Sequence, residues 1–138
     1  MEQFAAYGHA IVAMAGTAVF GLLISPLSAL RKSRVGLSPG CQPEPDYTSS
    51  VYRWHRAYCN LAETMGFFVA CTLAAILAGA SPFWVNLLAS VFFLSRIVLA
   101  VVHINGIGKP HMGARSFIYV AGWLACLLLA IMAIVAVF

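Results

Sequence analysis

Acidic residues are scarce in this chain of 138 residues, which has four Asp and Glu against eight Lys and Arg. Charged residues of both signs make up only 9% of the chain, whereas they make up about 25% of a soluble domain. Hydrophobic residues make up 62%. These proportions exclude a soluble globular domain and predict an integral membrane protein of one domain.

Cysteine pairs with metal-ligand spacing are also missing. The four cysteines form no Cys-x-x-Cys motif, so no metal site is expected, and most are interpreted as buried small hydrophobic residues. The N-terminal residues Met1-Glu2-Gln3-Phe4 lack the basic region of a signal peptide. The apolar stretch that follows them is therefore interpreted as a retained first span.

Long apolar runs predict an all-α bundle of four transmembrane helices, at residues 4–30, 51–79, 82–104 and 113–138. Pro26 is expected to kink the first helix or to end it. Basic residues gather in the first and third loops: Arg31, Lys32, Arg34, Lys109 and nearby Arg115. The positive-inside rule then places these two loops in the cytoplasm and both termini outside. The short loops suit a bacterial inner membrane.

The net charge of +4 raises two other function classes. Nucleic-acid binding is excluded, because the basic residues lie at helix ends and inside helices and form no solvent-exposed patch. His55 and His103 could hold haem in a four-helix bundle. The sequence has no second pair of histidines deeper in the spans that would extend such a site. The basic excess is better explained by membrane orientation and an anionic ligand.

The second predicted helix carries one polar face. Arg53, Arg56, Asn60 and Glu63 are spaced by three, four and three residues, which places all four side chains on the same side of a helix. Each charge would cost about 2.5–3.5 kcal/mol in hydrocarbon. The pattern therefore predicts a polar pocket. In the alternative interpretation, Arg53 and Arg56 only extend toward the headgroups from the end of the span.

A further charge, Arg96, lies inside the third predicted span. Glu63 is the only acidic residue in the interior of any span. A buried charge needs a partner, so a structural ion pair between Glu63 and Arg96 is predicted to join the second and third spans.

The motif Arg53-x-x-Arg56-Ala57-x-x-Asn60-x-x-Glu63 resembles the family called membrane-associated proteins in eicosanoid and glutathione metabolism (MAPEG). The resemblance covers essentially the whole chain. Arg115-Ser116-x-x-Tyr119 also looks like the Arg-Ser-x-x-Tyr of the prostaglandin synthase branch. The resemblance implies a left-handed four-helix bundle, assembled as a homotrimer, with glutathione in clefts between subunits near the cytoplasmic face.

The same resemblance implies the roles of the site residues. Glutathione would be bound by Arg31, Arg53, Arg56, Asn60, Glu63, His103 and Tyr119. Arg115, with Ser116, would stabilise the glutathione thiolate, since a nearby cation lowers the pKa of a thiol from about 8.5. Arginine forks hold carboxylates, a glutamate takes the ammonium, and an amide pairs with a peptide group. The alternative for Arg115 is a charge that only sets topology.

Three departures limit what the resemblance implies. Cys59, Thr64 and Leu99 differ from the residues of the prostaglandin and leukotriene branches, so neither eicosanoid activity is predicted. Arg56 and Glu63 are both kept, whereas the non-enzymatic branch of the family loses the arginine and shortens the glutamate. The sequence therefore predicts a glutathione-dependent transferase or peroxidase, in detoxification, that acts on a hydrophobic small molecule or lipid hydroperoxide. The alternatives are a non-enzymatic lipid-binding or scaffold protein of the same fold, and a small membrane subunit whose charges serve only assembly.

Overall fold

The computed structural model describes residues 2–108 and 113–138, so the predicted loop residue Lys109 lies outside the described residues. A short helix is followed by four long ones: α1 (Glu2–Ala5), α2 (Gly8–Arg34), α3 (Ser50–Leu77), α4 (Pro82–Ile104) and α5 (Ala114–Val137). Each long helix is apolar enough and long enough to cross a membrane. The predicted all-α fold with four transmembrane helices is confirmed, and the protein is an integral membrane protein.

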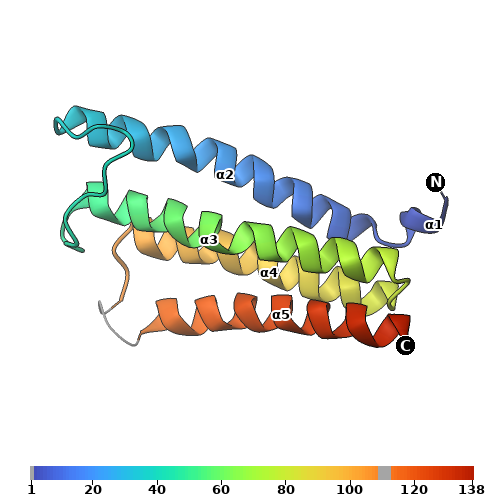
Figure 1. Cartoon of the computed structure of the whole chain (residues 1–138). Helices are drawn as coiled ribbons and strands as arrows, with labels where there is room; N and C mark the ends of the chain where they lie inside the picture. Colours follow the sequence, from blue (N-terminus) through green and yellow to red (C-terminus); the bar gives the residue numbers. More distant parts are fainter. Residues whose placement is uncertain (1, 109–112) are drawn as a thin grey trace.

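The four long helices form one bundle in which α3 and α4 are central (Figure 1). Helix α2 packs on both of them, and so does α5. The loop between α2 and α3 lies at the same end of the bundle as the end of α4 and the start of α5, and the two termini lie at the other end (Figure 1). Residues from both loop regions can therefore meet at one end.

Helix α2 differs from its predicted extent at both ends. It begins at Gly8, because residues 2–5 form the separate helix α1. It also continues past Pro26 to Arg34, so the alternative in which Pro26 ends the helix is wrong. Pro26 lies on an exposed face of the helix, and its missing N–H removes one bond from the helix ladder without ending the helix.

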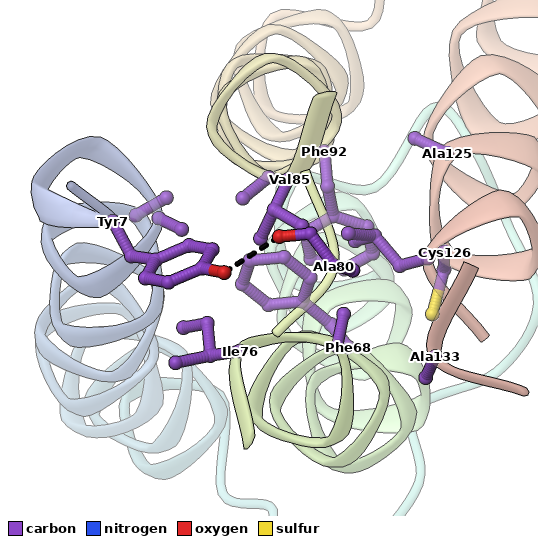
Figure 2. Close-up of a cluster of buried hydrophobic side chains, with 14 residues drawn as sticks. Tyr7, Phe68, Ile76, Ala80, Val85, Phe92, Ala125, Cys126 and Ala133 are labelled. Carbon is purple, nitrogen blue, oxygen red and sulfur yellow. Dashed lines mark hydrogen bonds between the residues drawn. The ribbon is translucent and has the colours of Figure 1, made fainter. Parts of the chain in front are cut away.

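The start of α2 is held by α4 and by the turn that precedes α4. The Tyr7 hydroxyl donates a hydrogen bond of 2.6 Å to the Ala80 carbonyl oxygen (Figure 2). The Asn86 side chain accepts from the Ala10 N–H at 2.9 Å and donates to the Ala6 carbonyl at 2.7 Å. Asn86 thus satisfies one of the backbone N–H groups that a helix start leaves without an intrahelical partner.

The largest apolar core lies among α2, α3, α4 and α5, away from the loop end (Figure 2). Phe68 of α3 and Phe92 of α4 are fully buried, and their rings stack with centroids 3.9 Å apart. Buried alanines around them, including Ala75, Ala89 and Ala125, let the helices approach closely. This core fixes how the helices are rotated and therefore which side chains face one another at the loop end.

Helix α3 starts where the sequence supplies a cap. The Ser49 side chain accepts from the Tyr52 N–H at 3.4 Å, as expected of serine at a helix N-terminus. This start places Arg53 and Arg56 in the first two turns, beside the loop that precedes the helix. The polar face predicted for this helix therefore begins at the loop end of the bundle.

Candidate functional site

A pocket of about 360 Å³ lies at the loop end, among α3, α4, α5 and the loop before α3. This volume falls in the range of small-molecule sites, about 300–1,000 Å³. It is lined by Tyr47, Arg56, Asn60, Glu63, Leu99, His103, Arg115, Ser116, Tyr119 and Val120. The pocket thus brings together every predicted binding or catalytic residue except Arg31 and Arg53.

Helix α3 contributes a row of three polar side chains to the pocket: Arg56, Asn60 and Glu63. Arg56 Nη1 lies 3.7 Å from Glu63 Oε1, and the side chains are 29% and 54% exposed. An ion pair this exposed adds only about 0–1 kcal/mol to stability. Asn60, between them on the helix, is buried and donates from Nδ2 to the Arg56 carbonyl at 2.9 Å. Both charges therefore remain accessible to a ligand.

The predicted Glu63–Arg96 ion pair is wrong within this chain. Glu63 lies on the exposed rim of the pocket beside Arg56, whereas Arg96 is only 2% exposed and faces α5. Arg96 Nη2 donates to the Tyr119 carbonyl at 2.9 Å, and its Cζ lies 5.0 Å from the Tyr119 ring centroid. A backbone carbonyl and an aromatic face therefore take the place of the expected carboxylate.

Helix α4 contributes His103 to the buried wall of the pocket. Asn60 Nδ2 lies 3.1 Å from His103 Nε2. Since an amide nitrogen only donates, Nε2 is assigned as the acceptor and the ring proton to Nδ1. Nδ1 is buried and has no hydrogen-bond partner within residues 2–108 and 113–138. Asn60 therefore holds the His103 ring, and Nδ1 is left as a buried donor without a partner in that part of the chain.

The first turn of α5 contributes Arg115 and Ser116. Arg115 is 8% exposed, and its Nη2 donates to the Gly108 carbonyl at 3.2 Å. Ser116 is exposed at the rim. An anion at this position would meet the positive end of the α5 dipole as well as the guanidinium. Tyr119 lies one turn further along and extends the same wall.

Tyr47, in the loop before α3, is a pocket residue that the sequence analysis did not identify. The Arg115 Cζ lies 4.3 Å from its ring centroid, and the His103 ring stacks on it at 6.1 Å. Asp46 fixes the adjoining turn by accepting from Thr48, and that side-chain hydrogen bond holds the pKa of Asp46 below its usual value. Tyr47 therefore connects the loop to both α4 and α5.

We expect Tyr47→Ala to weaken the predicted binding of glutathione about ten-fold, because His103 would lose the ring on which it stacks. Tyr47→Phe keeps that ring and should stay within about two-fold of the parent protein. Calorimetric titration of both variants with glutathione checks this. Equal losses in the two variants would instead assign the effect to the hydroxyl.

Two predicted binding residues lie outside the pocket. Arg53 donates to three backbone carbonyls, those of Ile104, Tyr47 and Thr48, at 3.1, 2.9 and 2.7 Å. It therefore fastens the loop to the end of α4. Arg31 lies over the Trp54 ring at 3.7 Å, between α2 and α3. Their positions give these two arginines structural contacts within the chain.

The pocket has a buried wall and an exposed rim. Asn60, Leu99, His103 and Arg115 are buried, whereas Glu63, Ser116 and Val120 are exposed. Two guanidinium groups and one carboxylate line it. Their charges complement a ligand that has more carboxylates than ammonium groups.

The profile of the MAPEG family matches residues 8–135, which include the whole of α2, α3 and α4, all but the end of α5, and the whole pocket. No curated protein and no solved structure matches the chain.

Proposed function

Because the chain belongs to the MAPEG family, we propose that it is a membrane-bound, glutathione-dependent transferase or peroxidase. Membership associates it with glutathione or eicosanoid metabolism. The observation that carries the proposal is the pocket, where three helices bring together two guanidiniums, a carboxylate, an amide, an imidazole, a serine hydroxyl and a phenol. An assembly protein or a simple lipid carrier has no evident need for this set of groups at one end of the bundle.

In this proposal the α3 face binds glutathione. Arg56 pairs with a carboxylate, and Glu63 turns from Arg56 to the ammonium group. Both donors of the Asn60 amide are already used, by the Arg56 carbonyl and by His103. The amide oxygen of Asn60 is therefore the group that accepts from a peptide N–H of glutathione. His103 and Tyr119 complete the binding wall.

Thiol activation is assigned to the start of α5. Arg115 and the α5 N-terminus together favour negative charge on the sulfur, which lowers the pKa of the glutathione thiol. The Ser116 hydroxyl donates a hydrogen bond to the thiolate. The thiolate then attacks the electrophilic carbon of a hydrophobic substrate and forms a thioether. Alternatively, it attacks the distal oxygen of a lipid hydroperoxide, which breaks the O–O bond, releases the lipid alcohol and leaves glutathione as a sulfenic acid that a second glutathione reduces.

An apolar cavity supports a hydrophobic second substrate. Its volume is about 240 Å³, and it is lined by Thr64, Phe67, Cys71, Phe92, Trp123, Cys126, Leu127 and Ala130. Thr64 directly follows Glu63, and Trp123 lies one turn beyond Tyr119. The cavity therefore lies further along α3 and α5 than the polar pocket, toward the middle of the membrane, where the apolar part of a substrate would lie.

The exposed rim supports a homotrimer in which a neighbouring subunit covers the pocket. Glu63 and Ser116 would then be enclosed between subunits, which excludes water from the thiolate. We further propose that the pocket end faces the cytoplasm of a bacterial cell, because Arg31, Lys32 and Arg34 lie at that end of α2.

The test is a glutathione titration of the detergent-purified protein. It follows the ultraviolet absorbance of the thiolate, with turnover of 1-chloro-2,4-dinitrobenzene and of a lipid hydroperoxide measured in the same sample. A saturable thiolate signal with turnover of either substrate supports the proposal. The absence of both signal and turnover would overturn it and leave a lipid-binding or scaffold protein.

A further inference from the structure

Arg53, near the start of α3, joins the loop before α3 to the end of α4. Its Nε donates to the Ile104 carbonyl at 3.1 Å, and its Nη1 donates to the carbonyls of Tyr47 and Thr48 at 2.9 and 2.7 Å. These bonds use the one hydrogen of Nε and both hydrogens of Nη1. A bidentate grip on a carboxylate needs two neighbouring nitrogens of the guanidinium. Arg53 can therefore grip a ligand in that way only by giving up one of these bonds.

The end of α4 is shaped to receive the Arg53 side chain. The turn after the helix bonds to the carbonyls of residues 101, 102 and 103. Ile104 is the last residue of α4, so its carbonyl has no intrahelical partner and accepts from Arg53 instead. Gly106 has a φ of 65°, and a Cβ there would lie 3.3 Å from both Cδ and Nε of Arg53. A larger residue would crowd the guanidinium at this turn.

The loop residue that Arg53 holds, Tyr47, has its ring against two other helices. The His103 ring of α4 stacks on it with centroids 6.1 Å apart, and the Arg115 Cζ of α5 lies 4.3 Å from its centroid. His103 directly precedes Ile104 in the chain. One guanidinium therefore fixes the backbone on both sides of the contact between Tyr47 and His103.

We propose that Arg53 is a positioning residue of the pocket, which acts on glutathione through Tyr47 and makes no contact with the ligand. The proposal rests on the proposed function, in which the pocket binds glutathione. Tyr47 and His103 line the pocket, whereas Arg53 does not. This role replaces the direct contact with glutathione that the family resemblance implies for Arg53.

The position of Tyr47 in the chain explains why it needs such a residue. Tyr47 lies in an irregular loop, where no repeating backbone pattern fixes the direction of a side chain. A wall that is already ordered binds a ligand with a smaller loss of entropy. Without the bonds from Arg53, the Tyr47 ring would have to be ordered against His103 each time glutathione binds.

The test is a double-mutant cycle on the full-length protein in detergent, with glutathione affinity measured by calorimetric titration. Arg53→Gln keeps a good helix former and removes the guanidinium. We expect it to weaken binding about ten-fold, as expected for Tyr47→Ala, and to add less than about two-fold in the Tyr47→Ala background. Losses that multiply in the double variant would show direct contact and overturn the proposal. Unchanged affinity in Arg53→Gln would also overturn it.

Two further variants separate geometry from charge. Arg34→Gln removes the same charge from an exposed position at the loop end of α2, and affinity should stay within about two-fold of the parent protein. Arg53→Lys keeps the charge but has no planar group to hold three carbonyls, so it should bind as weakly as Arg53→Gln. Parent-like affinity in Arg53→Lys would assign the effect to charge and overturn the proposal. If Arg53→Gln does not fold, Arg53→Lys takes its place in the cycle.

Amide hydrogen exchange, followed by mass spectrometry without glutathione, tests the loop contact by itself. The Thr48 N–H donates to Asp46 Oδ1 and the Ser49 N–H to the Asp46 carbonyl. Their exchange in Arg53→Gln should be at least about three-fold faster than in Arg34→Gln. Equal exchange in the two variants would overturn the proposal even if glutathione binds. Faster exchange in a protein that binds no glutathione would support the loop contact and overturn the proposed function instead.

Discussion

Replacing Arg115 with alanine is expected to slow turnover about 100- to 1,000-fold while changing glutathione affinity less than about three-fold. The guanidinium lies in the first turn of α5 and is buried against Tyr47, where it donates to the Gly108 carbonyl. In the proposed function it acts from that position on the charge that develops on sulfur, whereas Arg56 and Glu63 would hold the ends of glutathione. Steady-state kinetics together with a glutathione titration of the thiolate absorbance measure the two effects separately.

Arg115→Lys is the matched control for this experiment. Lysine keeps the positive charge but loses the planar fork that lies over the Tyr47 ring. We expect it to restore part of the rate, because charge near the sulfur is the main requirement. If Arg115→Ala reduces affinity and turnover equally, Arg115 is a binding residue and the thiolate must be stabilised elsewhere.

Gly122→Ala is expected to destabilise the bundle by about 2–4 kcal/mol and to lower the Tm in detergent by about 10 °C. A Cβ at this position would collide with Arg96 Nη2 and Ser95 Oγ. The guanidinium has little freedom to move, because Nη2 donates to the Tyr119 carbonyl at 2.9 Å and the side chain is only 2% exposed. Displacing a buried cation from its contacts inside a membrane protein is costly.

The chain offers a close control in Gly66→Ala. Gly66 is also in the middle of a transmembrane helix, but a Cβ there would meet nothing within 4 Å. This substitution should be neutral or slightly stabilising, since alanine favours a helix over glycine by about 1 kcal/mol. Thermal unfolding followed by circular dichroism compares the two variants. Equal Tm values for both would contradict close packing at Gly122.

A double substitution tests whether Arg96 causes the loss of stability expected for Gly122→Ala. In an Arg96→Met background the guanidinium is gone, so Gly122→Ala should cost less than it does alone. The contact with Ser95 remains, so the rescue is expected to be partial. An equal cost in both backgrounds would show that Arg96 does not restrict this position.

The candidate site was predictable where its residues share one helix. The spacing of Arg56, Asn60 and Glu63 fixes them on one face, because the helical repeat alone determines that geometry. The structure places all three in one pocket. Their roles toward glutathione rest on the resemblance, since local spacing does not identify a ligand.

Contacts between helices were predicted less well. Charge counting paired Arg96 with Glu63, but α4 is rotated so that Arg96 faces the Tyr119 carbonyl of α5. Tyr47 was missed because it lies in an irregular loop, where no periodic pattern indicates which way a side chain points. Its position depends on Arg53, which donates to the Tyr47 carbonyl at 2.9 Å.

The sequence by itself determined that this chain crosses a membrane four times and that one helix carries a polar face. Composition and helical periodicity suffice for this, because the cost of charge in hydrocarbon and the helical repeat are local properties. Only the tertiary structure decided that His103 meets Asn60, that Arg115 lies over Tyr47, and that Gly122 makes room for Arg96. Those contacts depend on the rotation and depth of each helix, which are set by packing around the Phe68 and Phe92 core.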